Sequence, residues 1–324
     1  MRERPIGFVF HDVPAGRYLA ELGRRAEQLG YESLWVAETR LTRDAVSAVG
    51  ALAAATNEIR LGTSIVNTWT RGPVLMALTA ASLDDLAPGR FVLGLGTASD
   101  PLISNQGVER RRPLTQMREY VDAVRRLLRL ESVTVEGAVV RVHDVTLDLL
   151  RSAPREPVEV PIYIGATGGK MLDLAAEIAD GVILNLFLPI EYTRAARDRV
   201  GTLEAPQLVA AAVSHDGAEA RTVAQRFVTM YLGGQPHIAR ELGLDPELVG
   251  RLAELLGSWP PRPGGLDEAM RLLGGEIVDR LAVAGTASGC RDGVDAWVEA
   301  GASLPLIVPL TENVGEIMDA FAPR

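Results

Sequence analysis

Several residue types and patterns are scarce in this 324-residue sequence, and each shortage excludes a class of protein. Cys290 is the only cysteine, so no disulfide can form within the chain, which favours a reducing compartment. No apolar run approaches the roughly 20 residues of a transmembrane helix, and residues 1–5 lead directly into a predicted strand. The formal net charge of −9 argues against nucleic acid as a partner. These features predict a soluble cytoplasmic protein.

The signatures of several enzyme classes are missing as well. The 4 histidines are scattered, and there is neither a cysteine cluster nor an H-E-x-x-H motif, so no metal site is predicted. A G-x-S-x-G elbow is also missing, which argues against a serine hydrolase. Gly94 and Gly96 form a G-x-G pair, but the third glycine and the following acid of a dinucleotide-binding fingerprint do not follow.

Lysine is the scarcest charged residue, because Lys170 is the only one and arginine supplies every other basic side chain. Lys170 follows a predicted buried strand at residues 162–164 and the glycines Gly165, Gly168 and Gly169, and a helix is predicted to begin there. Free backbone amides, a helix N-terminus and an ammonium group then converge, which favours binding of a phosphate. The alternative is that the glycines only turn the chain and that Lys170 is solvated.

Predicted strands alternate with predicted helices along the chain. The strands are expected at residues 6–10, 33–36, 59–65, 91–95, 162–164, 182–185, 207–213 and 306–308. Eight such strands favour an α/β fold of the closed (β/α)8 TIM-barrel type over an open doubly wound sheet. We expect a single domain over residues 1–324, with a hairpin insertion at about 131–148 and a helical insertion before the last strand at about 215–280.

In a barrel of this kind, the residues just after each strand carry the chemistry. Those positions here hold mostly small, hydrogen-bonding side chains, which include His11, Glu38, Thr63, Ser64, Asn67, residues 97–100 and Asn185. The helical insertion and the loops 100–112 and 233–237 are expected to line the mouth of the site.

Four segments together resemble a known family. They are residues 61–67 (LGTSIVN), 81–98 (ASLDDLAPGRFVLGLGTA), 161–170 (PIYIGATGGK) and 179–181 (ADG). They resemble the bacterial luciferase-like flavin and deazaflavin oxidoreductases, and the resemblance runs nearly from end to end. It is nearest to the branch of methylenetetrahydromethanopterin reductase and glucose-6-phosphate dehydrogenase, whose members use coenzyme F420. It implies a barrel with an insertion before the last strand.

The resemblance also implies roles for individual residues. Ser64 and Ile65 match a bulge in the third strand, where a cis non-prolyl peptide backs the deazaflavin ring. Gly168, Gly169 and Lys170 match the loop that holds the cofactor phosphate. The full set of cofactor-binding residues implied is Glu38, Thr39, Thr63, Ser64, Ile65, Thr97, Ala98, Gly165, Ala166, Gly168, Gly169, Lys170 and Asn185.

Two departures from the family pattern concern the substrate. Sugar-phosphate dehydrogenases of this branch carry a histidine after the second-strand acid, where this chain has Thr39, and a glutamate in the fourth loop, where residues 97–100 read TASD. Both departures weaken a prediction of glucose-6-phosphate chemistry. The candidates for proton transfer are then His11, Glu38, Ser99 and Asp100, and the alternative for each is that it only orients a ring or binds water.

The function implied is that of an F420-dependent oxidoreductase, which transfers a hydride between a deazaflavin and a C=N, C=C or C=O bond of a small organic substrate. The alternatives are a monooxygenase that uses reduced FMN and a non-catalytic flavin-binding relative. A helix that a barrel normally exposes carries several apolar residues, namely Leu75, Met76, Leu78, Leu83 and Leu86. They predict a homodimer through the early helices, unless they only pack onto the barrel.

Overall fold

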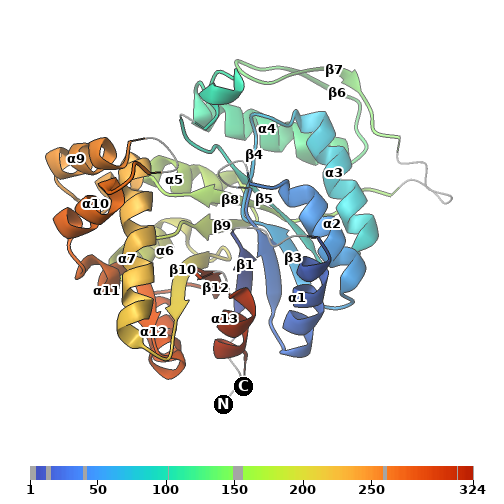
Figure 1. Cartoon of the computed structure of the whole chain (residues 1–324). Helices are drawn as coiled ribbons and strands as arrows, with labels where there is room; N and C mark the ends of the chain where they lie inside the picture. The colour runs from blue at the N-terminus through green and yellow to red at the C-terminus, as the bar shows by residue number, and fades with distance from the viewer. Residues whose placement is uncertain are drawn as a thin grey trace.

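Eight parallel strands close into a ring, which confirms the predicted (β/α)8 barrel (Figure 1). The structure is a computed structural model that describes residues 5–11, 16–38, 42–100, 102–148, 156–257, 261–311 and 313–323. Each strand pairs with the next around the ring, and the last strand returns to the first. In ring order the strands are β1 (Gly7–Phe10), β2 (Ser33–Val36), β3 (Arg60–Thr63), β5 (Phe91–Gly96), β8 (Ile162–Ala166), β9 (Gly181–Leu184), β10 (Pro206–Val213) and β12 (Leu304–Pro309).

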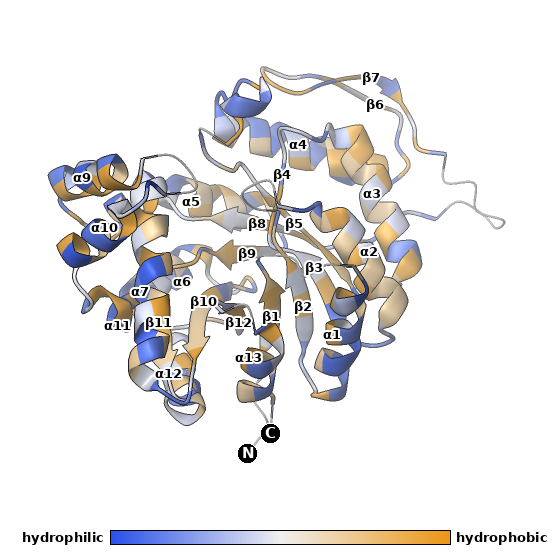
Figure 2. Ribbon diagram, viewed as in Figure 1, coloured by the Kyte–Doolittle hydropathy of each residue, from blue (hydrophilic) through white to orange (hydrophobic). Residues whose placement is uncertain are grey.

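Helices surround this ring and bury the outer face of the strands. Because both faces of a strand are covered, the strands are mostly apolar, as in β5, where all 6 residues are buried. Figure 2 shows the hydrophobic strands at the centre and hydrophilic stripes on outer helices such as α1. The helices next to the ring are α1 (Gly16–Gln28), α2 (Ala45–Ala55), α3 (Pro73–Leu86), α4 (Pro113–Leu128), α5 (Gly169–Ile178), α6 (Ile190–Val200), α12 (Ala287–Glu299) and α13 (Val314–Ala320).

The third strand is interrupted, whereas the sequence predicts one strand over residues 59–65. β3 ends at Thr63, the Ser64–Ile65 peptide is cis as the resemblance implied, and β4 (Val66–Asn67) then pairs with β5. Gly94 of β5 lies against this interruption, since a Cβ built there would be 1.8 Å from the carbonyl oxygen of Thr63. Gly94 therefore permits close packing of two strands and does not form a dinucleotide-binding turn.

Two segments extend beyond the ring. β6 (Val133–Glu136) and β7 (Arg141–Val145) form an antiparallel hairpin outside α4. The carboxylate of Glu119 on α4 accepts hydrogen bonds from three backbone amides at the hairpin tip, at 2.8 to 2.9 Å. The long segment after β10 is helical and consists of α7 (Gly217–Gly234), α8 (Pro236–Glu241), α9 (Pro246–Leu256), α10 (Gly265–Leu273) and α11 (Ile277–Leu281).

The sequence does not predict the short strand β11 (Ala282–Gly285), which follows these helices. Ala210 and Ala211 of β10 pair with both β11 and β12, so β11 lies on the edge of β10 opposite to β12. Its sequence, AVAG, holds a single β-branched residue, so it gives almost no strand signal.

A polar cluster lies at the N-terminal ends of the strands. The guanidinium of Arg60 donates to the Glu204 carboxylate at 3.1 Å and to the Tyr163 hydroxyl at 2.5 Å. Burial raises the pKa of Tyr163, whose ring also packs against Trp35. These side chains fill the barrel at the N-terminal ends of its strands. A ligand is therefore expected at the carboxyl ends. Within the described residues, no helix is long and apolar enough to cross a membrane.

Candidate functional site

A cavity of about 590 Å³ opens at the carboxyl ends of the barrel strands. Most of the residues predicted for the site line it, although they come from widely separated parts of the sequence. They are His11, Glu38, Ser64, Ile65, Thr97, Ala98, Ser99, Gly165, Ala166, Gly168, Gly169, Lys170 and Asn185. The barrel thus brings together the ends of β1, β2, β5, β8 and β9 with the break after β3.

Two predicted residues do not line the cavity, and a third cannot be placed. Thr63 is 1% exposed, and its hydroxyl donates to the Gly94 carbonyl at 2.8 Å and accepts from the Gly94 amide at 2.9 Å. Thr63 therefore does not line the cavity, because its hydroxyl joins two strands. Asp100 is exposed and accepts from the Ser104 amide at 3.3 Å, outside the cavity lining. Thr39 lies outside the described residues.

Ile65 forms one wall of the cavity, and two glycines give it room. A Cβ at Gly96 would lie 2.6 Å from the Ile65 side chain, and one at Gly165 would lie 2.9 Å from it. The amide of Glu38 donates to the Ile65 carbonyl at 3.2 Å and so fixes this segment to the end of β2. The result is an apolar surface against which a flat ring system can pack.

The start of α5 forms a cradle for an anion. Gly168 is the N-cap residue and offers no side-chain cap, so the first amides of the helix are left for another acceptor. The guanidinium of Arg199 approaches from α6, within 3.1 to 3.4 Å of where a Gly169 side chain would begin. Glu241 is the opposing charge, with an oxygen 3.8 Å from the corresponding position at Gly168. Arg199 is also paired with Asp173 of α5 at 2.9 Å, so Lys170 is the cation of the cradle for which no ion pair is found among the described residues.

Asn185 belongs to a network behind this cradle. Its side-chain amide donates to the Thr167 hydroxyl at 3.0 Å, and its oxygen accepts from the Tyr231 hydroxyl at 3.0 Å. The Tyr192 hydroxyl donates to the Thr167 carbonyl at 2.5 Å, and burial raises the pKa of Tyr192. The network ties β8, β9 and α7 together and fixes the position of the loop.

Glu38, whose amide is bonded to Ile65, carries a partly buried carboxylate. One oxygen accepts from the Asn67 side-chain amide at 3.1 Å, and the other lies 3.9 Å from the Arg71 guanidinium. Both neighbours hold the carboxylate in one orientation. Within the described residues, no group of three His, Cys, Asp or Glu side chains could hold a metal ion.

The family model of the luciferase-like monooxygenases matches residues 7–304 of this chain. The chain belongs to the luciferase-like family. It is 29% identical over 298 residues to a 5,10-methylenetetrahydromethanopterin reductase of Methanolobus tindarius, covering 87% of each chain. It is 34% identical over 177 residues, about half of each chain, to an F420-dependent glucose-6-phosphate dehydrogenase of Kineococcus radiotolerans. The coenzyme F420-dependent tetrahydromethanopterin reductase of Methanopyrus kandleri has the same fold, with a TM-score of 0.82, 21% identity and coverage of 99% of this chain and 98% of that one.

Several cavity residues of this luciferase-like chain were not predicted individually. The mouth is lined by Arg110, Tyr231, Gln235 and His237, where the sequence indicated only the helical insertion and the loops 100–112 and 233–237. Arg110 donates from Nε to the Thr97 carbonyl at 3.0 Å, which holds its guanidinium beside the end of β5. Burial, together with Arg110 and Arg240, lowers the pKa of His237. The mouth therefore presents a neutral imidazole and a guanidinium.

A hydrogen bond between two loops also borders the mouth of the luciferase-like barrel. The Ser99 hydroxyl donates to the Gln235 side-chain oxygen at 3.0 Å, so the loop after β5 touches the junction of α7 and α8. Ala98, next to it, has a φ of +42°, which is a strained conformation for a residue with a Cβ. Strained backbone of this kind is often found where a loop must face a ligand.

Proposed function

We propose that this chain is an F420-dependent oxidoreductase that transfers a hydride between the deazaflavin and a small organic molecule. The observation that carries the proposal is the meeting of an anion cradle at the start of α5 and an apolar wall at Ile65 in one cavity. A cofactor with a phosphate at one end and a flat ring at the other fits this pair. The relatives named above as F420-dependent enzymes support the same choice.

The residues that would hold the cofactor follow from this geometry. The amides after Gly168, with Lys170 and Arg199, would bind the phosphate, and Ile65 would support one face of the ring. Thr97 and Ala98 line the cavity next to that wall and would contact the ring edge. When bound, the deazaflavin supplies two-electron hydride chemistry, and the protein supplies position and electrostatics.

The protein must also hold or move a proton when a hydride enters or leaves the substrate. His11, Glu38 and Ser99 line the cavity, so each stays a candidate, whereas Asp100 lies outside it. Glu38 is the best placed, because Asn67 and Arg71 fix its orientation next to the ring wall. His237 is a further candidate, and in its neutral form it can accept a proton.

Anaerobic titration of the purified protein with F420 and with FMN, followed by fluorescence, tests the proposal. We expect F420 to bind saturably and the bound cofactor to exchange a hydride with a substrate in the absence of oxygen. Activity that requires oxygen and reduced FMN, without binding of F420, would replace the proposal with a luciferase-like monooxygenase.

Three further features belong to the proposal. The chain acts as a single domain with the hairpin and the helical segment as insertions, it works in the cytoplasm, and it forms a homodimer. The dimer is supported by exposed leucines on α3, where Leu75, Leu78 and Leu86 are 51%, 39% and 52% exposed. Met76 and Leu83 are buried, so the predicted apolar face is narrower than the sequence indicated.

A further inference from the structure

The arginine at the mouth of the cavity is held in place at the end of β5. Arg110 donates from Nε to the Thr97 carbonyl at 3.0 Å and from Nη2 to the Thr97 hydroxyl at 3.5 Å. The same carbonyl accepts from Trp69 Nε1 at 2.9 Å. One edge of the guanidinium is therefore fixed before any ligand arrives, which lowers the entropy cost of binding through this side chain.

The other edge of the Arg110 guanidinium is available to a ligand. Arg110 lines the cavity and has no ion-pair partner among the described residues. Its Nη1 has no hydrogen-bond partner there either, and it is not one of the described side-chain atoms that are buried without a partner, so a ligand can reach it. The remaining N–H groups of Nη1 and Nη2 point in parallel, which fits the two oxygens of a carboxylate.

The nearest titratable side chain at the mouth does not neutralise this cation. Burial lowers the pKa of His237, and Arg110 lowers it further, so the two side chains lie within electrostatic range of each other. The hydrogen bond of 3.0 Å between Ser99 and Gln235 holds the two segments that carry them together. A neutral imidazole leaves the positive charge of Arg110 unopposed on this side of the mouth.

Apolar side chains flank Arg110 along the chain. Leu102, Pro113 and Leu114 line the same cavity, and they belong to the loop that carries Arg110 or to the first residues of α4. Glu38 brings a carboxylate to this cavity, so a ligand with several negative charges is disfavoured. The mouth therefore matches an organic molecule with an apolar body and a single negative charge.

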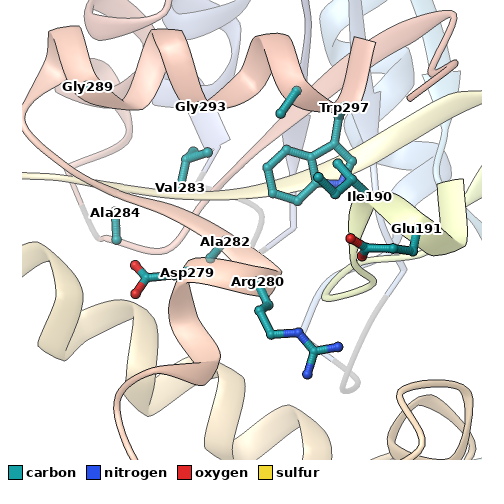
Figure 3. Close-up of a pocket in the computed structure, with 11 residues that line it drawn as sticks. Ile190, Glu191, Asp279, Arg280, Ala282, Val283, Ala284, Gly289, Gly293 and Trp297 are labelled. Carbon is teal, nitrogen blue, oxygen red and sulfur yellow. The ribbon is translucent and has the colours of Figure 1, made fainter. Parts of the chain in front are cut away.

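A second cavity, of about 330 Å³, does not offer this arrangement. It lies between α6, α11, β11 and α12 and shares no lining residue with the cavity at the strand ends (Figure 3). Its lining has two carboxylates, Glu191 and Asp279, against one cation, Arg280. Figure 3 shows the Arg280 guanidinium directed away from the indole of Trp297. An organic anion is therefore expected at the mouth of the barrel and not in this second cavity.

We propose that the substrate of this chain carries a carboxylate, which Arg110 binds through Nη1 and Nη2 at the mouth of the cavity. The apolar body of the substrate then packs against Leu102 and Leu114, between the carboxylate and the deazaflavin ring. Arg110 is a specificity-determining residue in this arrangement, because it selects an anionic substrate and fixes its orientation. The inference rests on the proposed hydride-transfer function, since it names the substrate class of the same cavity.

Two probes of the same shape test the charge requirement in the protein loaded with F420. We expect benzoate to bind saturably and uncharged benzamide to bind about tenfold or more weakly. Trp69 supplies the signal, because its Nε1 shares the Thr97 carbonyl with Arg110. The indole N–H signal of Trp69 should therefore shift as benzoate binds to a protein labelled with ¹⁵N-tryptophan, and Trp69→Phe identifies that signal by its loss. Phenyl phosphate, with a second negative charge, should bind no more tightly than benzoate.

Neighbouring arginines provide charge-matched variants. Arg110→Gln should weaken benzoate binding about tenfold or more, bring the affinities of benzoate and benzamide close together, and leave F420 affinity nearly unchanged. Arg111→Gln removes the same charge from the next residue, whose side chain is 57% exposed and lies 3.9 Å from the Glu109 carboxylate. It should leave benzoate binding unchanged, because Arg111 does not line the cavity.

The proposal is overturned if benzoate and benzamide bind alike, or if Arg110→Gln and Arg111→Gln weaken benzoate binding equally. It is also overturned if Arg110→Gln weakens F420 binding as much as benzoate binding, since Arg110 would then hold the cofactor. Tighter binding of phenyl phosphate than of benzoate would assign the mouth to a phosphate ester. Fluorescence titration of the unmodified protein separates the two levels of inference: absence of F420 binding contradicts the proposed function, whereas F420 binding without benzoate binding contradicts the carboxylate site alone.

Discussion

Gly169 marks the point where the chain can approach an anion closely, and an acidic side chain there should exclude one. In Gly169→Asp the Cβ of the new side chain would lie 3.1 to 3.4 Å from the Arg199 guanidinium, so the carboxylate it carries would stand at the cradle. We expect F420 affinity to fall tenfold or more, about 1.4 kcal/mol, because like charges would meet in a partly desolvated place. Fluorescence titration measures this affinity, with Gly169→Ala as the control for the added Cβ alone. Unchanged F420 binding in a folded Gly169→Asp protein would remove this loop from the cofactor site.

Glu38 allows a separation of catalysis from cofactor binding. Glu38→Gln keeps an oxygen that can accept from Asn67 but removes the charge and the exchangeable proton. If Glu38 moves the proton, kcat should fall about 100-fold or more while the Kd for F420 changes little, because the contact strengthens only in the transition state. Single-turnover kinetics and titration of the same variant measure the two quantities. Equal losses in kcat and F420 affinity would instead show that Glu38 positions the ring.

His237 should make stability depend on pH in a defined window. Its pKa in the folded protein is below the ordinary value of 6.5, first because of burial and then because of Arg110 and Arg240. As the pH falls through 6.5, the unfolded chain takes up a proton on His237 before the folded chain does, so this group lowers the stability of the fold below that pH. Above pH 7 both states are neutral and the contribution vanishes. Urea unfolding should therefore show a steeper loss of stability between pH 6.5 and 5 in the unmodified protein than in His237→Gln, and parallel profiles would refute the assignment.

The site residues that could be predicted from the sequence are those beside a recognisable local pattern, such as the end of a strand or the start of a helix. Gly168, Gly169 and Lys170 follow a strand and start a helix, so their convergence can be predicted without knowing the fold in detail. Arg110 and His237 carry no such signal. They line the same cavity only because the loop after β5 packs against the start of α8. The position of Thr63 outside the cavity lining could not be predicted, because the break after β3 changes which side chains face the cavity.

At the scale of elements, the period of the apolar residues predicted the bounds of most strands within two residues. β2 has the predicted bounds, since a short apolar run defines it. β11 escaped prediction because four small residues contribute little propensity, and its pairing with β10 is a tertiary effect. The break between β3 and β4 also has no periodic signal.

The contact between β3 and β5 gives a prediction at this scale. Gly94→Ala would place a Cβ 1.8 Å from the Thr63 carbonyl, and because that neighbour is backbone, the two strands must separate. We expect a loss of about 3 kcal/mol in the free energy of unfolding, near the upper range for overpacking. Gly250→Ala on α9 is the control, since it meets no atom within 4 Å and should stabilise the helix by about 0.5–1 kcal/mol. Similar stabilities of the two variants in urea unfolding would argue against the close approach.

At the scale of the whole molecule, one end of the barrel is held together by polar side chains and the other end contains the cavity. The Arg60, Tyr163 and Glu204 cluster holds the N-terminal ends of the strands, while the carboxyl ends carry the cavity. The closed ring could be predicted by counting strands, but the shape of the cavity mouth could not. That shape depends on how α7 and α8 fold back over the barrel, as the contact between Ser99 and Gln235 illustrates.

Exposed leucines on α3 predict that two copies of the chain form a dimer. α2 and α3 pack together, and α3 presents Leu75, Leu78 and Leu86 to solvent. Burial of these leucines against the same face of a second copy would give a closed, symmetric dimer, because each chain offers the patch that the other requires. Light scattering at micromolar concentration should therefore report twice the chain mass of 34.7 kDa.

Charged substitutions test which surface forms that dimer. The double variant Leu75→Glu, Leu78→Glu should raise the dimer Kd about 100-fold or more, because it removes two apolar contacts and places like charges across the symmetry axis. Leu272→Glu on α10 is the matched control, since Leu272 is 41% exposed on another side and its substitution should leave the mass unchanged. A monomeric mass for the unmodified protein would show that these leucines have no partner copy. A dimer that persists in the double variant but dissociates in Leu272→Glu would move the interface to the helices that follow β10.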